Sequence, residues 1–160
     1  MSVKERFIDN QDGSVTDSKT NLMWMKEDGW QAQAKWFTWD EALELVHYFN
    51  SLKFCSFQDW RMPSHEEIVT IYGEEASNQD KYGKEIHLFP VFPSGGQATV
   101  WLKGESGQEG TLFDFKNKEF RPLYKSKSGR MSVRLVRGEM LKSSKLARKM
   151  NLFTYNAILT

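Results

Sequence analysis

Short apolar runs, separated by polar turn residues, dominate the first 25 positions of the chain. Residues 7–17 predict two short strands around the Asp12-Gly13 turn, because glycine supplies the positive φ that hairpin turns need. The apolar run Leu22–Met25 predicts a further, buried strand. The hairpin does not match a calcium-binding loop, since Ile8 stands where a ligand is required and the twelfth position is not acidic. We therefore interpret it as a turn.

Two capping boxes predict two helices. Thr38 precedes Glu41 by three residues, and apolar residues then recur at helical spacing to about Leu52. The expected buried face of this helix consists of Trp39, Ala42, Leu43, Val46 and Phe49. Ser64 and Glu67 repeat the spacing and predict a second, shorter helix that ends near residue 72.

The segment between the two helices has the composition of a buried corner. Trp60 stands between Asp59 and Arg61, and Pro63 disfavours helix at the residue before it. Asp59 and Arg61 could together bind a ligand. We favour a structural ion pair, or hydrogen bonds from the guanidinium to backbone carbonyls. These four residues are therefore predicted to form scaffold.

The remaining segments predict loops and an antiparallel sheet. Residues 26–37 predict a loop that carries two indoles, Trp30 and Trp36, as exposed or anchoring side chains. Residues 73–97 predict a long irregular region with an apolar anchor, and loops of this length are often functional. Strands are predicted at residues 99–103, 111–115, 119–121 and 132–137.

The composition changes at the C-terminal end. Residues 139–160 predict a basic amphipathic helical tail attached to a single domain of residues 1–138. The cations of the tail are Lys142, Lys145, Arg148 and Lys149. The tail could contact an acidic partner or nucleic acid, but we favour a solvated basic face whose apolar side docks on the domain or on a second copy.

Composition and charge narrow the classes of function. The chain has 160 residues, of which 14% are aromatic, so we expect a core of large rings in one domain. Its net charge is +1, which disfavours nucleic acid as a partner. Cys55 is the one cysteine and excludes an intrachain disulfide, and a reducing compartment is the simpler setting. We expect a soluble, cytoplasmic protein with no membrane segment, or an exported one if a signal peptide has been removed.

Few residues predict catalysis or metal binding. His47, His65 and His87 lie on separate predicted elements without metal-ligand spacing, and no nucleophile or phosphate-binding motif is present. An enzyme would require His65, Glu66 or Asp114 to converge in a pocket. We predict no metal and no cofactor. Trp30, Trp36 and Trp101 are the candidate binding platforms, because indole faces stack on sugars or bury in protein partners, although core packing explains each equally well.

Three motifs make the chain resemble the bacterial Lcl C-terminal-like domain family. Residues 6–24 resemble the family's opening F-x-D-N-G-D-G-T-V-T-D…T-G-L-M-W, and residues 38–67 are similar to T-W-x-x-A…D-W-R-L-P-T-x-x-E. Residues 133–137 are similar to V-R-C-V-R. The resemblance implies an α+β fold of the C-type-lectin-like class, with two helices packed on a twisted antiparallel sheet and long loops. Formylglycine-generating enzymes share this fold, but their oxidation uses paired cysteines, which one Cys55 cannot supply.

The chain departs from the family at two places. Leu135 stands where many members have a cysteine, and Val46 occupies the expected partner position, in agreement with a reducing compartment. Residues 100–104 replace the usual Y-W-S-S-T, which weakens any ligand role for that strand. The calcium-binding signatures of C-type lectins (E-P-N, Q-P-D and W-N-D) are not present in the chain.

We therefore expect a non-catalytic, calcium-independent recognition module that binds a glycan or a protein through its loops and exposed aromatic side chains. The alternative is an intracellular interaction or assembly subunit, in which the basic tail contacts a partner or forms a homo-oligomer.

Overall fold

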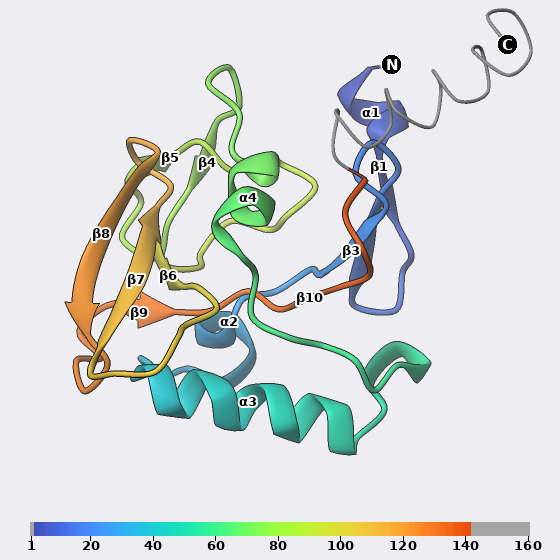
Figure 1. Ribbon diagram of the computed structural model, residues 1–160. Coiled ribbons are helices and arrows are strands. Elements are labelled where there is room, and N and C mark those ends of the chain that lie inside the picture. The colour runs from blue at the N-terminus through green and yellow to red at the C-terminus, as the bar shows by residue number, and fades with distance from the viewer. Residues whose placement is uncertain (1, 142–160) are drawn as a thin grey trace, which may run out of the picture.

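The computed structural model describes residues 2–141, and these residues form an α+β fold (Figure 1). The helices are α1 (Val3–Arg6), α2 (Gly29–Gln33), α3 (Trp39–Ser51) and α4 (His65–Ile68), with 3-10 turns η1 (Phe54–Ser56) and η2 (Val69–Ile71). The strands are β1 (Phe7–Asp9), β2 (Ser14–Asp17), β3 (Leu22–Met25), β4 (Asn78–Gln79), β5 (Glu85–Ile86), β6 (Thr99–Trp101), β7 (Glu109–Asp114), β8 (Glu119–Tyr124), β9 (Met131–Ser132) and β10 (Val136–Arg137).

The strands form two separate four-stranded sheets and a small hairpin. One sheet has the order β1-β2-β3-β10 and is antiparallel throughout. The other has the order β8-β7-β6-β9, in which β9 runs parallel to β6. The two sheets lie on opposite sides of the view in Figure 1, with α3 below them. The predicted α+β class with antiparallel pairing is thus confirmed, but the strands are divided between two sheets instead of one, and β9 is parallel to β6.

The segment from residue 131 to residue 137 joins the two sheets, and it is not the single strand predicted. Its first end pairs with β6 and its last end with β3. Between them, Val133, Arg134 and Leu135 are all buried. The sequence predicted one continuous strand at residues 132–137, but residues 133–135 cross the interior between the two sheets.

The N-terminal hairpin and β3 confirm the predicted strands. Gly13 has a φ of 97°, as the turn requires. A Cβ at this position would also lie 2.8 Å from the ring of Phe54, so only glycine fits here. In the same turn, Asp12 accepts hydrogen bonds from both the backbone and the hydroxyl of Ser14.

The helix starts at Thr38 and Ser64 are confirmed, since both residues form capping boxes. The second helix is shorter than predicted, because α4 ends at Ile68 and continues as a 3-10 turn. The loop predicted for residues 26–37 instead contains α2, which has its own capping box between Asp28 and Gln31. Within the predicted loop of residues 73–97, the structure adds the β4–β5 hairpin.

Large aromatic side chains dominate the core, as the composition predicted. The largest fully buried side chains include Trp24, Trp60, Trp101, Phe92, Phe113 and Phe115. The buried apolar residues form two clusters, one around Trp24 and Phe113 and one around Trp60 and Trp101. Val46 and Leu135, which stand where the family often has cysteines, are both buried in the second cluster.

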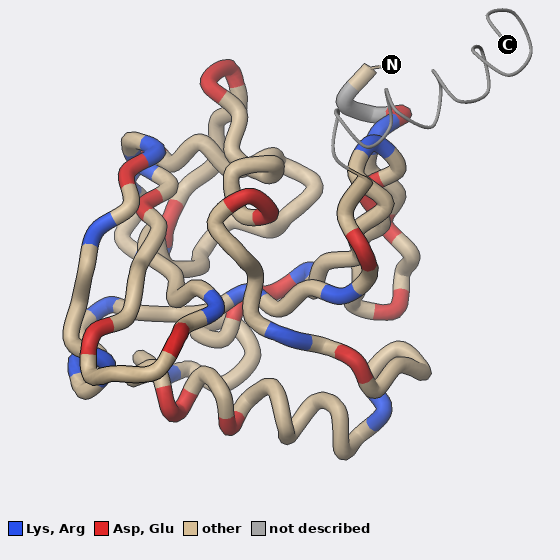
Figure 2. Tube along the Cα trace, viewed as in Figure 1, with Lys and Arg blue, Asp and Glu red and all other residues tan. Residues whose placement is uncertain are grey.

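The described part of the chain contains no helix long and apolar enough to cross a membrane. Its charges are mixed, and Figure 2 shows lysine and arginine interspersed with aspartate and glutamate along the trace. The tail predicted for residues 139–160 lies outside the described residues from position 142 onward.

Candidate functional site

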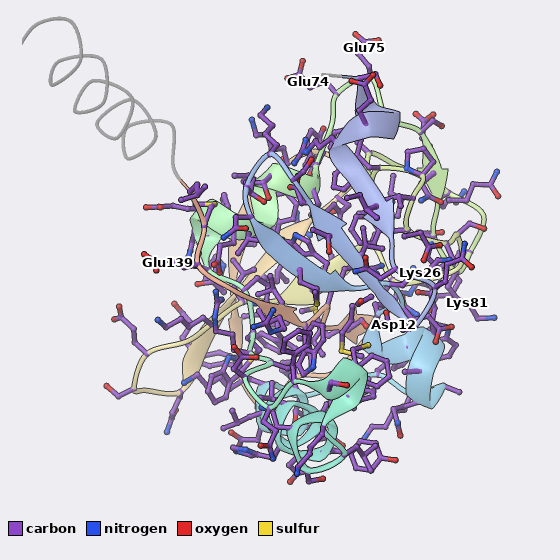
Figure 3. The ribbon with its side chains drawn as sticks, turned by 90° about the vertical axis from the view of Figure 1, so that its right-hand side faces the viewer. Asp12, Lys26, Glu74, Glu75, Lys81 and Glu139 are labelled. Carbon is purple, nitrogen blue, oxygen red and sulfur yellow. The ribbon has the colours of Figure 1, made fainter. Side chains whose placement is uncertain are left out.

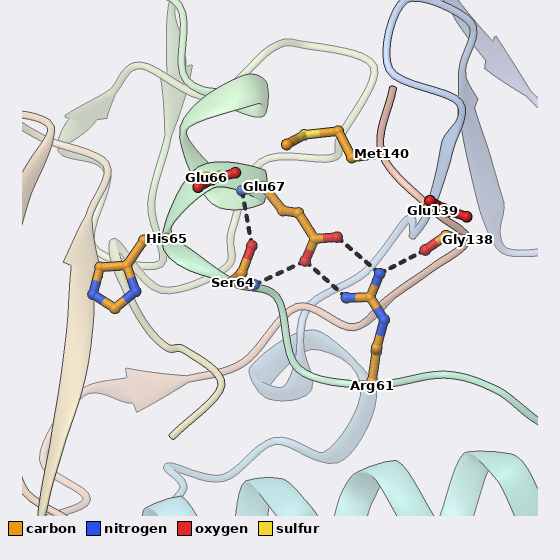
Figure 4. A pocket seen from close by; sticks show the side chains of 8 residues that line it. All are labelled: Arg61, Ser64, His65, Glu66, Glu67, Gly138, Glu139 and Met140. Carbon is orange, nitrogen blue, oxygen red and sulfur yellow. Dashed lines mark hydrogen bonds and ion pairs between the residues drawn. The ribbon is translucent and has the colours of Figure 1, made fainter. Parts of the chain in front are cut away.

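A pocket of about 630 Å³ opens beside the start of α4 (Figure 4), and we call it the α4 pocket. Its described lining consists of Arg61, Ser64, His65, Glu66, Glu67, Gly138, Glu139 and Met140. The first five come from the end of the Trp60 corner and from the cap and first turns of α4. The other three come from the chain just after β10.

An ion pair between Arg61 and Glu67 forms one wall of the α4 pocket. The guanidinium of Arg61 donates to both carboxylate oxygens of Glu67, at 2.7 and 2.8 Å, and to the carbonyl of Gly138 at 2.6 Å. Glu67 also accepts the backbone N–H of Ser64 at 2.9 Å, which completes the capping box of α4. The carboxylate of Glu67 thus binds the N-terminus of α4 directly and, through Arg61, joins the Trp60 corner to the residue that follows β10.

The protonation of Glu67 follows from these contacts. Burial raises the pKa of its carboxyl, but the hydrogen bonds from Arg61 and from Ser64 outweigh burial, so the pKa is lowered overall. The group is therefore ionised at neutral pH and acts as an anchor for Arg61.

The residues on which an enzyme would depend do not all meet in the α4 pocket. His65 and Glu66 line it, and the His65 ring stacks on Phe120 at 4.8 Å between centroids. Asp114 is not among the described lining residues, and its carboxylate binds Arg121 at 2.9 Å and the backbone N–H of Lys116. The Ser64 hydroxyl accepts the backbone N–H of Glu67 as the helix cap.

The predicted pair between Asp59 and Arg61 is replaced by two other pairs. Asp59 binds Arg137 at 2.7 and 3.1 Å, and hydrogen bonds from that guanidinium lower the pKa of the Asp59 carboxyl. Arg61 binds Glu67 instead, because the α4 cap lies on its side of the corner. The bond from Arg61 to the carbonyl of Gly138 agrees with the alternative interpretation, that of a guanidinium bound to backbone.

The corner itself is buried around its indole. Trp60 is 1% exposed, and its Nε1–H donates to the carbonyl of Phe54 at 2.9 Å. Its backbone N–H and carbonyl both bind the side chain of Asn50 on α3. Pro63 is also buried, and its carbonyl accepts the N–H of Lys103 from beyond β6.

The three candidate tryptophans have different environments. Trp101 is 0% exposed and donates its Nε1–H to the carbonyl of Phe37 at 2.7 Å, so it belongs to the core and offers no face to a ligand. Trp36 is 41% exposed. Trp30 is half-buried in α2, with the ammonium of Lys81 5.5 Å from its ring centroid. The platform role was thus wrong for Trp101 and stays a prediction for the other two.

The sequence did not indicate a further exposed aromatic side chain, Tyr82, which lies next to the Trp30–Lys81 pair. Tyr82 is 41% exposed, and the guanidinium of Arg130 lies 4.5 Å from its ring centroid. Tyr82 follows Lys81 directly, so the two ring–cation pairs adjoin. We call Trp30, Lys81, Tyr82 and Arg130 the aromatic–cation patch. The sequence shows a tyrosine in the long loop region, but no local pattern indicates that Arg130 packs on its ring.

The aromatic–cation patch and the α4 pocket are separate surfaces. Lys81 of the patch and Glu139 of the pocket lie at opposite edges of the view in Figure 3. Among residues 2–141, no group of three or more histidine, cysteine or acidic side chains is arranged to hold a metal ion. Cys55 is half-buried, and burial raises the pKa of its thiol to about 11, with Asp12 acting in the same direction.

The sequence was also compared with known protein families and with curated proteins. The model of the family described as the Lcl C-terminal domain matches residues 13–137, which include every predicted motif after the first strand. No curated protein matches the chain.

Proposed function

The chain belongs to the Lcl C-terminal domain family, and on that premise we propose that it is a non-catalytic recognition module whose ligand binds at the aromatic–cation patch. The C-type-lectin-like class, which the resemblance implies, is part of this proposal. A carbohydrate is the ligand that fits the patch best, and a protein surface is the alternative ligand.

The observation that carries the proposal is the pairing of two accessible rings with two cations where the long loop region meets α2. Tyr82 is 41% exposed with the guanidinium of Arg130 4.5 Å from its ring centroid, and half-buried Trp30 has the ammonium of Lys81 at 5.5 Å. Aromatic faces stack on the C–H surfaces of sugars, while the N–H groups of Lys81 and Arg130 are in place to donate to hydroxyl oxygens.

Calcium independence is part of the proposal, since the patch supplies two cations and no carboxylate. A calcium ion requires several oxygen ligands, which these four side chains do not provide.

A glycan array tests the function. Fluorescently labelled full-length protein is applied with and without a calcium chelator, and we expect binding to one class of glycan that is equal in both conditions. Binding that disappears with the chelator would refute calcium independence. An array without binding would refute a carbohydrate ligand. The alternative ligand, a protein surface, would then be the one to test.

The second candidate is an interaction or assembly subunit that uses the basic tail from residue 139. The observation in its favour is that the tail lies beyond the family match, which ends at residue 137, and carries four of the chain's cations within residues 142–149. Sedimentation velocity of the full-length chain tests self-assembly, and a monomer at all concentrations would oppose it.

A further inference from the structure

The four residues of the aromatic–cation patch lie on three segments that are distant in sequence. Trp30 belongs to α2, Lys81 and Tyr82 lie between β4 and β5, and Arg130 precedes β9. A ligand that contacts both rings therefore requires these segments to keep a fixed spacing. Residues 93–99, which we call the central segment, form hydrogen bonds with all three of them.

The turn after β4 is held by the middle of the central segment. The backbone N–H of Lys81 donates to the carbonyl of Gly96 at 2.6 Å, and the N–H of Gly95 donates to the carbonyl of Gln79 at 3.0 Å. Two consecutive glycines have wide backbone freedom, so their position depends on attachments on either side of them.

The C-terminal side of this glycine pair is attached to the start of α2. Asp28 accepts the backbone N–H of Gln97 at 2.8 Å, and a Cβ on Gly96 would lie 2.6 Å from the same carboxylate oxygen. The central segment therefore packs directly against the helix cap. The Thr99 hydroxyl donates to the carbonyl of Arg130 at 3.1 Å, so this end also holds the third part of the patch.

The N-terminal side of the glycine pair is attached to α2 by the side chain of Gln31. Its Nε2 donates to the carbonyl of Pro93 at 3.2 Å and to the carbonyl of Ser94 at 3.0 Å. Its Oε1 accepts the backbone N–H of Asp28 at 3.0 Å as part of the capping box. One amide thus closes the start of the helix that carries Trp30 and also holds the central segment.

The spacing of Trp30 from Arg130 has an attachment of its own. The backbone N–H of Trp30 donates to the hydroxyl of Ser132 at 3.0 Å, and Ser132 lies in β9, directly after Arg130. The bonds of Gln31 therefore act on the other spacing in the patch, that of Trp30 from Lys81.

We propose that Gln31 is a positioning residue of the aromatic–cation patch, which sets the spacing of Trp30 from Lys81 through its two bonds to the central segment. A loop that is already held in its bound conformation loses less entropy when the ligand binds, so these bonds raise affinity without contact between Gln31 and the ligand. This inference rests on the proposed function, since the spacing matters only for a ligand that binds at the patch.

Gln31→Glu separates the two roles of the side chain. A glutamate at the third helical position still accepts the N–H of Asp28, so the capping box remains. Its second oxygen cannot donate and would face two carbonyl oxygens, so the attachment to the central segment is lost. Gln33→Glu, at the exposed last residue of α2, makes the same change of charge outside this contact and is the matched control.

The first readout needs no ligand. NOEs between the indole of Trp30 and the side chain of Lys81, whose ammonium lies 5.5 Å from the ring centroid, report the spacing. We expect these NOEs to be lost in Gln31→Glu and kept in Gln33→Glu. NOEs that persist in Gln31→Glu would overturn the proposal. A loss of stability in Gln31→Glu as large as that of Asp28→Ala would also overturn it, because a general loosening of α2 would then explain the change.

The second readout is the affinity of the glycan that the array selects, measured by calorimetry. We expect binding at least about tenfold weaker for Gln31→Glu and unchanged binding for Gln33→Glu. Lost NOEs with unchanged affinity would overturn the positioning role and leave the proposed function intact. An array without binding would refute the carbohydrate ligand of the proposed function, and the NOEs would still decide whether Gln31 sets the spacing.

Discussion

At the scale of single residues, Glu67 connects more parts of the site than any other side chain described above. Its side chain is 8% exposed, and it holds the guanidinium of Arg61 and the N-terminus of α4 together. Through Arg61 it also connects to the carbonyl of Gly138, the residue directly after β10. A buried acceptor with several donors is costly to replace, because each donor loses its partner.

We predict that Glu67→Gln lowers the free energy of unfolding by about 2 kcal/mol, the cost of weakening charge-assisted hydrogen bonds to a partly exposed arginine. The measurement is urea unfolding followed by tryptophan fluorescence. Glu44→Gln, at an exposed glutamate on α3, is the matched control, and we expect it to change stability by less than about 0.5 kcal/mol. Equal losses in both variants would contradict the role assigned to Glu67.

The lowered pKa of Glu67 gives this contribution a pH dependence. The folded value lies below the unfolded value of about 4.3, so the contribution is complete above that pH and is lost as the pH falls through the folded pKa. The stability gap between the parent and Glu67→Gln should stay constant from about pH 7 to about pH 5 and narrow below about pH 4. A gap that widens in acid would have the wrong sign for this account.

At this scale the sequence could not separate buried from exposed indoles. Trp101 stands between Val100 and Leu102, and Trp36 stands between Lys35 and Phe37. Both have an apolar neighbour, yet Trp101 is 0% and Trp36 is 41% exposed. Trp101 is enclosed by residues distant in sequence, and its N–H donates to the carbonyl of Phe37, 64 residues away. Contacts of that separation leave no periodic signal, whereas Trp60 was predictable because Asp59, Arg61 and Pro63 flank it.

At the scale of elements, helix starts determine much of the fold. The capping boxes at Thr38 and Ser64 were predictable, because a hydroxyl residue followed three positions later by a glutamate indicates a helix N-terminus. The box at Asp28 has the same geometry, but the helix that follows has only five residues and a weak apolar pattern, so periodicity could not reveal it. The prediction of one strand at residues 132–137 was wrong, because only its two ends pair with neighbouring strands and Val133, Arg134 and Leu135 between them are buried in the interior.

Asp28 has a second role that makes it more costly to replace than an ordinary cap. It accepts the N–H of Gln31 at 2.9 Å as the cap of α2, and its other oxygen accepts the buried N–H of Gln97 at 2.8 Å. We predict that Asp28→Ala costs about 2–3 kcal/mol of stability, against about 1 kcal/mol for Thr38→Ala, which removes a cap alone. Thermal unfolding of the two variants side by side is the measurement, and equal losses would argue against the second role.

Strand β8 is an edge strand of its sheet within the described residues, and proline protects it. The carbonyl of Thr111 accepts the N–H of Leu102, so Thr111 faces β6 and its register partner Pro122 faces away from β7. Pro122 thus removes a donor from the open edge, where Phe120 and Tyr124 are exposed.

We predict that Pro122→Val increases self-association, because it restores an outward N–H on an apolar edge. Sedimentation velocity over a range of concentrations is the measurement. Pro90→Val, at an exposed proline outside any strand, is the control that should leave the sedimentation unchanged. A monomeric Pro122→Val variant at all concentrations would contradict the protective role.

At the scale of the whole molecule, two sheets joined through the interior create two distinct surfaces. The aromatic–cation patch lies where α2 meets the long loop region, and the α4 pocket lies where the chain leaves β10. The class of fold could be predicted from the sequence because its motifs are local and ordered, from the opening hairpin to the last strand. The division into two sheets could not, because it depends on the pairing of β9 with β6 and of β10 with β3.

The candidate site also has a part that could be predicted from local sequence and a part that depends on the fold. Trp30 and Trp36 could be selected from the sequence as conspicuous rings in a polar segment. Tyr82 and Arg130 could not be connected, because the patch exists only after the residues around 81 and 130 have been brought to α2. The surface that we propose for recognition is thus a property of the folded molecule.

The most direct test of this proposal is the affinity of the glycan that the array selects, measured by calorimetry for Tyr82→Ala and Tyr48→Ala. Both tyrosines are exposed, at 41% and 50%, but Tyr48 lies on α3, outside the patch. We predict affinity at least about tenfold weaker for Tyr82→Ala, equivalent to about 1.4 kcal/mol, and unchanged for Tyr48→Ala. Unchanged affinity for Tyr82→Ala, or equal loss in both variants, would contradict recognition through the aromatic–cation patch.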